Sequence, residues 1–140
     1  MIRYVCFLLK DREKILLMIK VKRAYEDVEK KDGYRVLVDR LWPRGIKKED
    51  LLYDEWAKEL APSSELRKFF SHDKEKWKEF SSRFKKELRK KEAKDKIIEL
   101  AKKAKKRNVT LIFSAKDEDY NNAILLKEVI EKTMRENQDE

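Results

Sequence analysis

The chain has little of the residues that build cofactor loops and metal sites. Its 140 residues include two glycines, two prolines, one cysteine and one histidine. Gly33 and Gly45 stand too far apart for a Walker loop or a dinucleotide fingerprint, which need several glycines at fixed spacing. Cys6 and His72 alone form neither an internal disulfide nor a zinc site. No spacing among the acidic residues indicates a Mg²⁺ site, so we expect no metal and no cofactor.

Long hydrophobic runs are also missing. The apolar run Tyr4–Leu9 is far shorter than a membrane span, and no small-residue cleavage site follows it. We therefore expect no membrane association, and the single cysteine favours the reducing cytoplasm.

The first 17 residues differ in pattern from the rest of the chain. A strand pattern begins at Met18, so we expect residues 1–17 to be an N-terminal extension outside the native domain. On this interpretation, deleting the extension leaves the fold nearly intact. The alternative is an extra strand or helix at the sheet edge. We expect residues 18–135 to form one domain and residues 136–140 to fray.

Charge is what the sequence has in abundance. Charged residues make up 46% of the chain, and its formal net charge is +9. The stretch from Arg67 to Arg107 holds 18 Lys and Arg against 7 Asp and Glu, a local balance of +11. One interpretation is a face for nucleic acid; the other is a solvated helix surface laced with salt bridges. The composition also resembles that of proteins from hot environments.

The hydrophobic pattern predicts an α/β fold. Alternating or β-branched apolar runs predict strands at Ile19–Tyr25, Val36–Val38 and Val109–Phe113. Helical spacing predicts helices over residues 51–60, 65–70, 74–89, 94–107 and from about 120 to 134, with caps at Ser63 or Ser64, at Asp73, and at Asp117 or Asp119. In the third helix, Trp77, Phe80, Phe84 and Leu88 form one apolar stripe typical of a core-facing side.

These elements predict a single small domain with a central, mostly parallel sheet and helices packed around it. The connection between the first two strands is too short for a parallel crossover, so they should be antiparallel or non-adjacent. The strand at Val109–Phe113 follows several helices and is expected to lie parallel to Val36–Val38.

Polar residues follow two of the predicted strands. Asp39, Arg40 and Arg44 surround a Trp-Pro corner after one strand, and Ser114 and Lys116 follow the other. In open α/β sheets, ligands bind beyond the carboxyl ends of the strands. The final helix begins beside this place, and its first turn adds Asn121 and Asn122.

This constellation predicts a binding site for a small phosphate- or carboxylate-bearing ligand. Asp39 is expected to orient an arginine or to act as a base. The alternative is purely structural: Asp39 pairs with an arginine to hold the turn, and Asn121 caps its own helix. Cys6 lies in the extension, so thiol chemistry has no nucleophile at a strand end, and His72 is expected in a turn rather than as a general base.

Three blocks of the sequence resemble a known family. They are Gly33-Tyr-Arg-Val-Leu-Val-Asp-Arg-Leu-Trp-Pro-Arg-Gly45; Glu59-Leu-Ala-Pro-Ser63 with Glu65-Leu-Arg-Lys68 and His72-Asp73; and Phe113-Ser-Ala-Lys-Asp117 with Asn121-Asn-Ala123. Together they resemble the YeaO-like branch of a domain family of unknown function, over about residues 19–130. The resemblance implies a small cytoplasmic α/β protein and transfers no activity, cofactor or catalytic residue.

Three hypotheses for function follow. The first is binding of a small anionic ligand at the strand ends, with or without catalysis. The second is weak, non-specific nucleic-acid binding by the basic middle helices, and the third is an interaction protein without activity. The sequence leaves the oligomeric state open.

Overall fold

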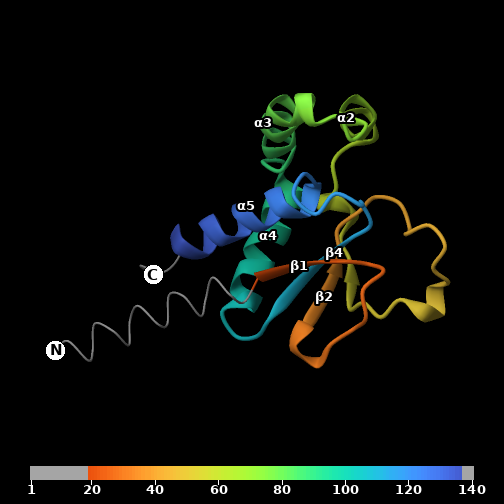
Figure 1. Ribbon diagram of the computed structural model, residues 1–140. Helices are drawn as coiled ribbons and strands as arrows, with labels where there is room; N and C mark the ends of the chain where they lie inside the picture. Colours follow the sequence, from red (N-terminus) through yellow and green to blue (C-terminus); the bar gives the residue numbers. More distant parts are fainter. Residues whose placement is uncertain (1–18, 137–140) are drawn as a thin grey trace, which may run out of the picture.

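Four parallel strands form the central sheet in the computed structural model, which describes residues 19–136 (Figure 1). They are β1 (Ile19–Arg23), β2 (Tyr34–Leu37), β3 (Glu55–Trp56) and β4 (Val109–Phe113). Their order in the sheet is β1-β4-β2-β3, and every neighbouring pair is parallel. The predicted α/β class is confirmed, as is the parallel pairing of β4 with β2. Because β4 lies between β1 and β2, the first two strands are non-adjacent, as their short connection requires.

Four α-helices accompany the sheet in the described residues. They are α2 (Ser64–Phe70), α3 (Trp77–Glu87), α4 (Lys91–Ala104) and α5 (Asn122–Glu136). The predicted cap of α2 is confirmed, since the Ser63 hydroxyl accepts a hydrogen bond from the Leu66 N–H at 3.1 Å. Asp73 likewise caps the 3₁₀ turn Lys74–Lys76 that leads into α3. The helix predicted over residues 94–107 is α4, which begins and ends three residues earlier than predicted.

The main core lies between one face of the sheet and the helices. Side chains along each strand alternate between the two faces of the sheet, as a pleated strand requires. Those on the core face are at most 2% exposed at Ile19, Val36, Val109 and Leu111. The predicted stripe of α3 packs into the same core through Phe80, Phe84 and Leu88. In Figure 1, α4 and α5 run along the sheet, whereas α2 and α3 lie at the end to which the strands point.

Connecting segments, rather than helices, cover the other face. Its smaller core packs Leu37 and Ile112 from the sheet against Trp42, Ile46 and Trp56. The Trp42 ring stands edge-on to Trp56, with ring centroids 5.6 Å apart, and its indole N–H donates to the Ile46 carbonyl at 2.6 Å. These contacts fix the turn that follows β2.

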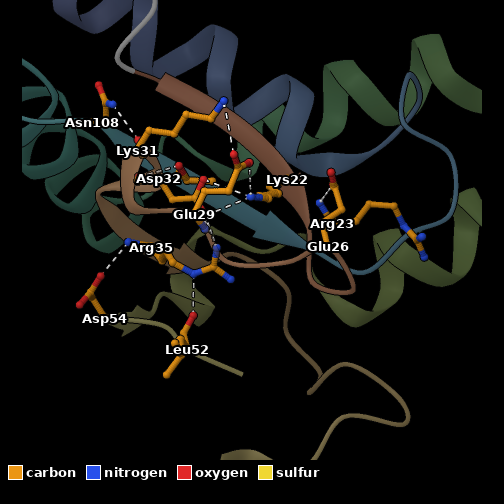
Figure 2. Close-up of polar contacts among 11 residues, drawn as sticks. Lys22, Arg23, Glu26, Glu29, Lys31, Asp32, Arg35, Leu52, Asp54 and Asn108 are labelled. Atoms are coloured by element: carbon orange, nitrogen blue, oxygen red, sulfur yellow. Dashed lines mark hydrogen bonds and ion pairs between the residues drawn. The ribbon is translucent and has the colours of Figure 1, made fainter. Parts of the chain in front are cut away.

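An ion cluster lies on this second face (Figure 2). We call it the buried ion cluster, since Lys22, Asp32 and Arg35 are buried and only Glu29 is exposed. Arg35 donates to Asp32 at 2.6 Å, and the Lys22 ammonium reaches Asp32 at 3.1 Å and Glu29 at 2.9 Å. Burial raises the pKa of Asp32, but hydrogen bonds from the Glu29 N–H, Lys22 and Arg35 outweigh it and leave the pKa lowered. The cluster holds the segment after β1 against the sheet.

The prediction of a short helix over residues 51–60 is wrong. Glu55 and Trp56 instead pair with Val36 and Leu37 as β3, and Lys58–Leu60 forms a 3₁₀ turn. The segment has good helix formers, but pairing with a buried strand and the seating of the Trp56 ring override that local preference.

Residues 1–17, predicted as an extension, lie outside the described residues, as do residues 137–140 of the predicted tail. Glu136 is the last described residue and belongs to α5. Within the part of the chain that the structure describes, no helix is both long and apolar enough to cross a membrane.

Candidate functional site

A pocket of about 670 Å³, the strand-end pocket, opens beyond the carboxyl ends of β2 and β4. Parallel neighbours end at the same edge of a sheet, so the segments that follow them meet there. All seven residues predicted for the site line this pocket: Asp39, Arg40, Arg44, Ser114, Lys116, Asn121 and Asn122. The structure thus brings these residues to one pocket at the start of the final helix, and their role as a ligand site stays a prediction.

Asp39 joins three elements at the floor of the pocket. One carboxylate oxygen accepts hydrogen bonds from the Ser114 N–H at 2.9 Å and the Ser114 hydroxyl at 2.6 Å. The other accepts from the side-chain amide of Asn122 at 3.2 Å, which also donates to the Val38 carbonyl at 3.1 Å. The ends of β2 and β4 and the first turn of α5 are thereby tied together.

The expectation that Asp39 contacts an arginine is wrong. In the described structure its side-chain partners are Ser114 and Asn122, whereas Arg40 turns away and donates to the Pro62 carbonyl at 3.2 Å. Successive side chains after a strand point in different directions, so a neighbour in sequence need not be a neighbour in space.

The cap of α5 also differs from the prediction. Asn121, rather than Asp117 or Asp119, accepts the hydrogen bond of the Ile124 N–H at 3.0 Å. Asp117 instead accepts from the N–H groups of Tyr120 and Asp119 within the preceding loop, and these bonds lower its pKa. The structural alternative for Asn121 is thus correct. Because Asn121 is 3% exposed and bonds within its own loop and helix, its role at the pocket is to shape it.

Four cations line the pocket: Arg40, Arg44, Arg67 and Lys116. All four are exposed, and among residues 19–136 none forms an ion pair. Only Asp39 and Asp117 bring carboxylates to the lining, and both already accept hydrogen bonds from the protein. The N-terminus of α5 adds its positive dipole end. The pocket is therefore electropositive.

Two further residues position the polar part of the pocket, and the sequence interpretation missed both. Arg23, at the end of β1, donates to the carbonyls of Ala115 and Ser114 at 2.9 and 3.4 Å and so fixes the segment after β4. Tyr25 donates its hydroxyl to the Arg44 carbonyl at 2.8 Å, which anchors the turn that carries Arg44. A basic residue ending the first strand is the one sequence signal that could have indicated Arg23.

The wall opposite the sheet comes from the α2–α3 pair, which sequence reasoning did not connect to the site. Arg67 and Phe70, three residues apart on α2, both reach the pocket, as do His72 and Phe80. His72 lies in the predicted turn, where it and Ser71 have positive φ values of 59° and 41°. The helical spacing of Arg67 and Phe70 places them on one face, but the sequence does not tell what that face meets.

The buried ion cluster is a separate concentration of charge, and it needs no ligand. Each charged group in it has a partner of opposite sign: Lys22 with Glu29, and Arg35 with Asp32. Arg35 also donates to the Leu52 carbonyl at 2.7 Å. We assign this cluster a structural role. In the described part of the chain, His, Cys, Asp and Glu form no group of three able to hold a metal ion.

Comparisons with known proteins identify relatives of the chain. Residues 18–140 match the model of the family described as "Inactive DUF488-N3 subclade". The chain is 49% identical to the uncharacterized protein YeaO of Escherichia coli over 108 residues, which are 77% of this chain and 92% of YeaO. It is 50% identical to the uncharacterized protein Rv3073c of Mycobacterium tuberculosis over 70 residues, 50% of this chain and 59% of that protein. No solved structure matches.

Proposed function

The chain belongs to the family described as the inactive DUF488-N3 subclade, and from that premise we propose that the strand-end pocket binds a small phosphate- or carboxylate-bearing ligand without transforming it. The observation that carries the proposal is the set of four lining cations that lack anionic partners within residues 19–136. A ligand anion is the group that they, and the N-terminus of α5, would stabilise.

Binding without reaction fits the groups at the floor of the pocket. Ser114 and Asp39 are the one hydroxyl–carboxylate pair there, and the carboxylate accepts three hydrogen bonds from Ser114 and Asn122. These three donors fix the orientation of the Asp39 carboxylate and tie three elements together, which suits a positioning role. The description of the family as inactive points in the same direction.

Calorimetric titration with inorganic phosphate and with acetate tests the proposal. We expect Arg44→Ala to weaken phosphate binding about 10- to 100-fold, because a hydrogen bond to a charged partner contributes roughly 1.5–3 kcal/mol. Arg44→Lys should recover only part of the affinity, since an ammonium cannot form the bidentate fork of a guanidinium. The Tyr25 bond to residue 44 uses its backbone carbonyl and survives both substitutions.

A matched control separates the pocket from overall charge. Lys91 is an exposed cation at the start of α4 and does not line the pocket, so Lys91→Ala removes one positive charge elsewhere. Phosphate affinity should be nearly unchanged in this variant. Equal losses in Lys91→Ala and Arg44→Ala, or no binding of either anion to the unmodified protein, would overturn the proposal and favour an interaction protein.

The nucleic-acid alternative has one structural feature in its favour. A second groove of about 790 Å³ lies where the α3–α4 turn meets the end of α5. Its basic lining residues are Lys85, Arg89, Lys94, Lys132 and Arg135. Two glutamates also line it, and Glu128 pairs with Lys85 at 3.7 Å, which offsets part of the charge.

Binding of nucleic acid at this groove would be non-specific and sensitive to salt, because phosphate contacts release counterions. Fluorescence anisotropy of a labelled duplex at rising salt tests this alternative. Arg89→Ala and Lys94→Ala should then weaken binding together and flatten its salt dependence, whereas Arg44→Ala should have little effect. Sequence-selective binding that survives high salt would contradict it.

A further inference from the structure

The strand-end pocket has an aromatic wall beside its cations, and from the two together we propose that its ligand is a mononucleotide, a phosphate ester that carries a planar base. This inference rests on the proposed function and narrows it to one class of phosphate compound. The phosphate would lie among the cations at the strand ends, and the base would lie against the wall formed by the α2–α3 pair and the loop before α5.

The aromatic wall is rigid without a ligand. Phe70 and Phe80 stack with ring centroids 4.5 Å apart and planes 24° apart, and both residues are buried. Tyr120, which also lines the pocket, stands edge-on to Trp77 at 5.2 Å. The two phenylalanines form the buried base of the wall, and the half-buried Tyr120 is the ring that it offers to a ligand. A ring already held by its neighbours loses little freedom when an aromatic group packs on it, so this surface is organised in advance.

Leu41 extends the apolar surface on the side of β2. It lines the pocket, follows Arg40 directly, and is 56% exposed. An exposed leucine and guanidinium groups thus line one pocket, a combination that suits a ligand with a flat apolar part and a charged part. Arg67 lies one helical turn before Phe70 and brings a further planar cation to the wall.

The size of the pocket also favours an ester over a bare anion. Its volume of about 670 Å³ falls in the usual range for organic ligands, about 300–1,000 Å³. A water molecule takes up about 30 Å³ of liquid, so the pocket has room for far more than one phosphate group. An inorganic phosphate at the cations would leave the half-buried Tyr120 and the exposed Leu41 without a partner in the pocket.

A calorimetric comparison of four probes tests the inference: inorganic phosphate, ribose 5-phosphate, AMP and adenosine. AMP should bind about 10- to 100-fold more tightly than ribose 5-phosphate, since stacking of a base on aromatic side chains has an effect of that size. Adenosine should bind more weakly than AMP because it lacks the group that the cations hold. Arg44→Ala should weaken AMP and inorganic phosphate by similar factors.

Two leucines supply a matched pair of variants for the apolar surface beside the wall. Leu41→Ser should weaken AMP several-fold and leave inorganic phosphate unchanged. Leu52 is 60% exposed and lies outside the pocket, so Leu52→Ser is the control and should alter neither affinity. Both leucines are exposed, so neither substitution removes a core contact, and unfolding by urea checks that both variants remain folded.

The outcomes separate this inference from the proposed function. If phosphate and ribose 5-phosphate bind in an Arg44-dependent way but AMP binds no more tightly, the mononucleotide inference is overturned and anion binding stands. If AMP binds tightly but Leu41→Ser and Leu52→Ser behave alike, the base does not lie in this pocket and the inference fails too. If no probe binds, both proposals fall.

Discussion

Ser114 donates two hydrogen bonds to one carboxylate oxygen of Asp39, from its backbone N–H at 2.9 Å and from its hydroxyl at 2.6 Å. The two residues lie 75 positions apart in sequence and directly after neighbouring parallel strands. These two hydrogen bonds therefore hold together the ends of β2 and β4, beyond which the strand-end pocket opens. They also occupy Asp39, which leaves the nearby arginines without a carboxylate partner.

Removal of the Asp39 carboxylate should reduce stability. Asp39→Ala leaves the half-buried Ser114 and Asn122 donors without their acceptor, and a hydrogen bond to a charged group contributes roughly 1.5–3 kcal/mol. We expect urea unfolding to show a loss of at least about 2 kcal/mol. Ser114→Ala should cost less, and the double variant should cost less than the sum of the two. Additive losses would contradict a direct coupling between the residues.

The sequence was sufficient to place these residues together but not to pair them. Polar residues directly after two buried strands indicate a common site, because parallel strands end at one edge, and all seven predicted residues line the pocket. The partners of Asp39 come from 75 and 83 positions away, and no spacing along the chain indicates them. The expected partners, Arg40 or Arg44, are near Asp39 in sequence, but the Arg40 side chain instead donates to the Pro62 carbonyl.

The rest of the pocket depends on how helices dock. The apolar stripe that includes Phe80 predicted a core-facing helix, and Phe80 is 2% exposed, yet it also lines the pocket. Helical periodicity tells which side is buried but not which surface it meets. The strand β3 was missed for a related reason, since two residues become a strand only through pairing with β2.

Tyr34 should lose its phenol proton at a higher pH than an ordinary tyrosine. Burial, together with the hydrogen bond that its hydroxyl donates to Glu55 at 2.8 Å, raises the pKa of Tyr34 to about 12. The fold therefore favours the neutral phenol, and this stabilisation is present below the unfolded pKa of about 10 and is lost as pH rises toward 12. Ultraviolet titration of tyrosinate should show one late phase that is absent in Tyr34→Phe and retained in Tyr53→Phe. A late phase that persists in Tyr34→Phe would refute the assignment.

The two glycines should differ in their tolerance of alanine. Both have positive φ values, 65° at Gly33 and 84° at Gly45. A Cβ at Gly33 would overlap the carbonyl oxygen of Asn108, which also accepts the Tyr34 N–H, whereas nothing lies within 4 Å of a Cβ at Gly45. Gly45→Ala should cost about 1–2 kcal/mol from the backbone alone. Gly33→Ala should cost clearly more in urea unfolding, and equal costs would contradict the close approach.

The buried ion cluster should make stability depend on pH at both ends of the scale. The pKa of Asp32 is lowered by its net environment, so its contribution is present above the unfolded value of about 3.9 and is lost as pH falls through the folded value. Burial lowers the pKa of Lys22, but hydrogen bonds to Glu29 and Asp32 outweigh it and leave the pKa raised. The lysine's contribution is therefore present below about pH 10.4 and is lost above that as pH rises.

Asp32→Asn tests the acid limb of this dependence. The substitution leaves the Lys22 and Arg35 cations, 9% and 5% exposed, without their shared carboxylate. Loss of one partner of a buried ion pair costs about 3–5 kcal/mol, so urea unfolding at neutral pH should show a loss of that size. The variant should also lose less stability than the unmodified protein on acidification, because the carboxyl that must be protonated is gone. Asp27→Asn, at an exposed position, is the control. If Asp32→Asn is as stable as this control at neutral pH, the cluster does not stabilise the fold.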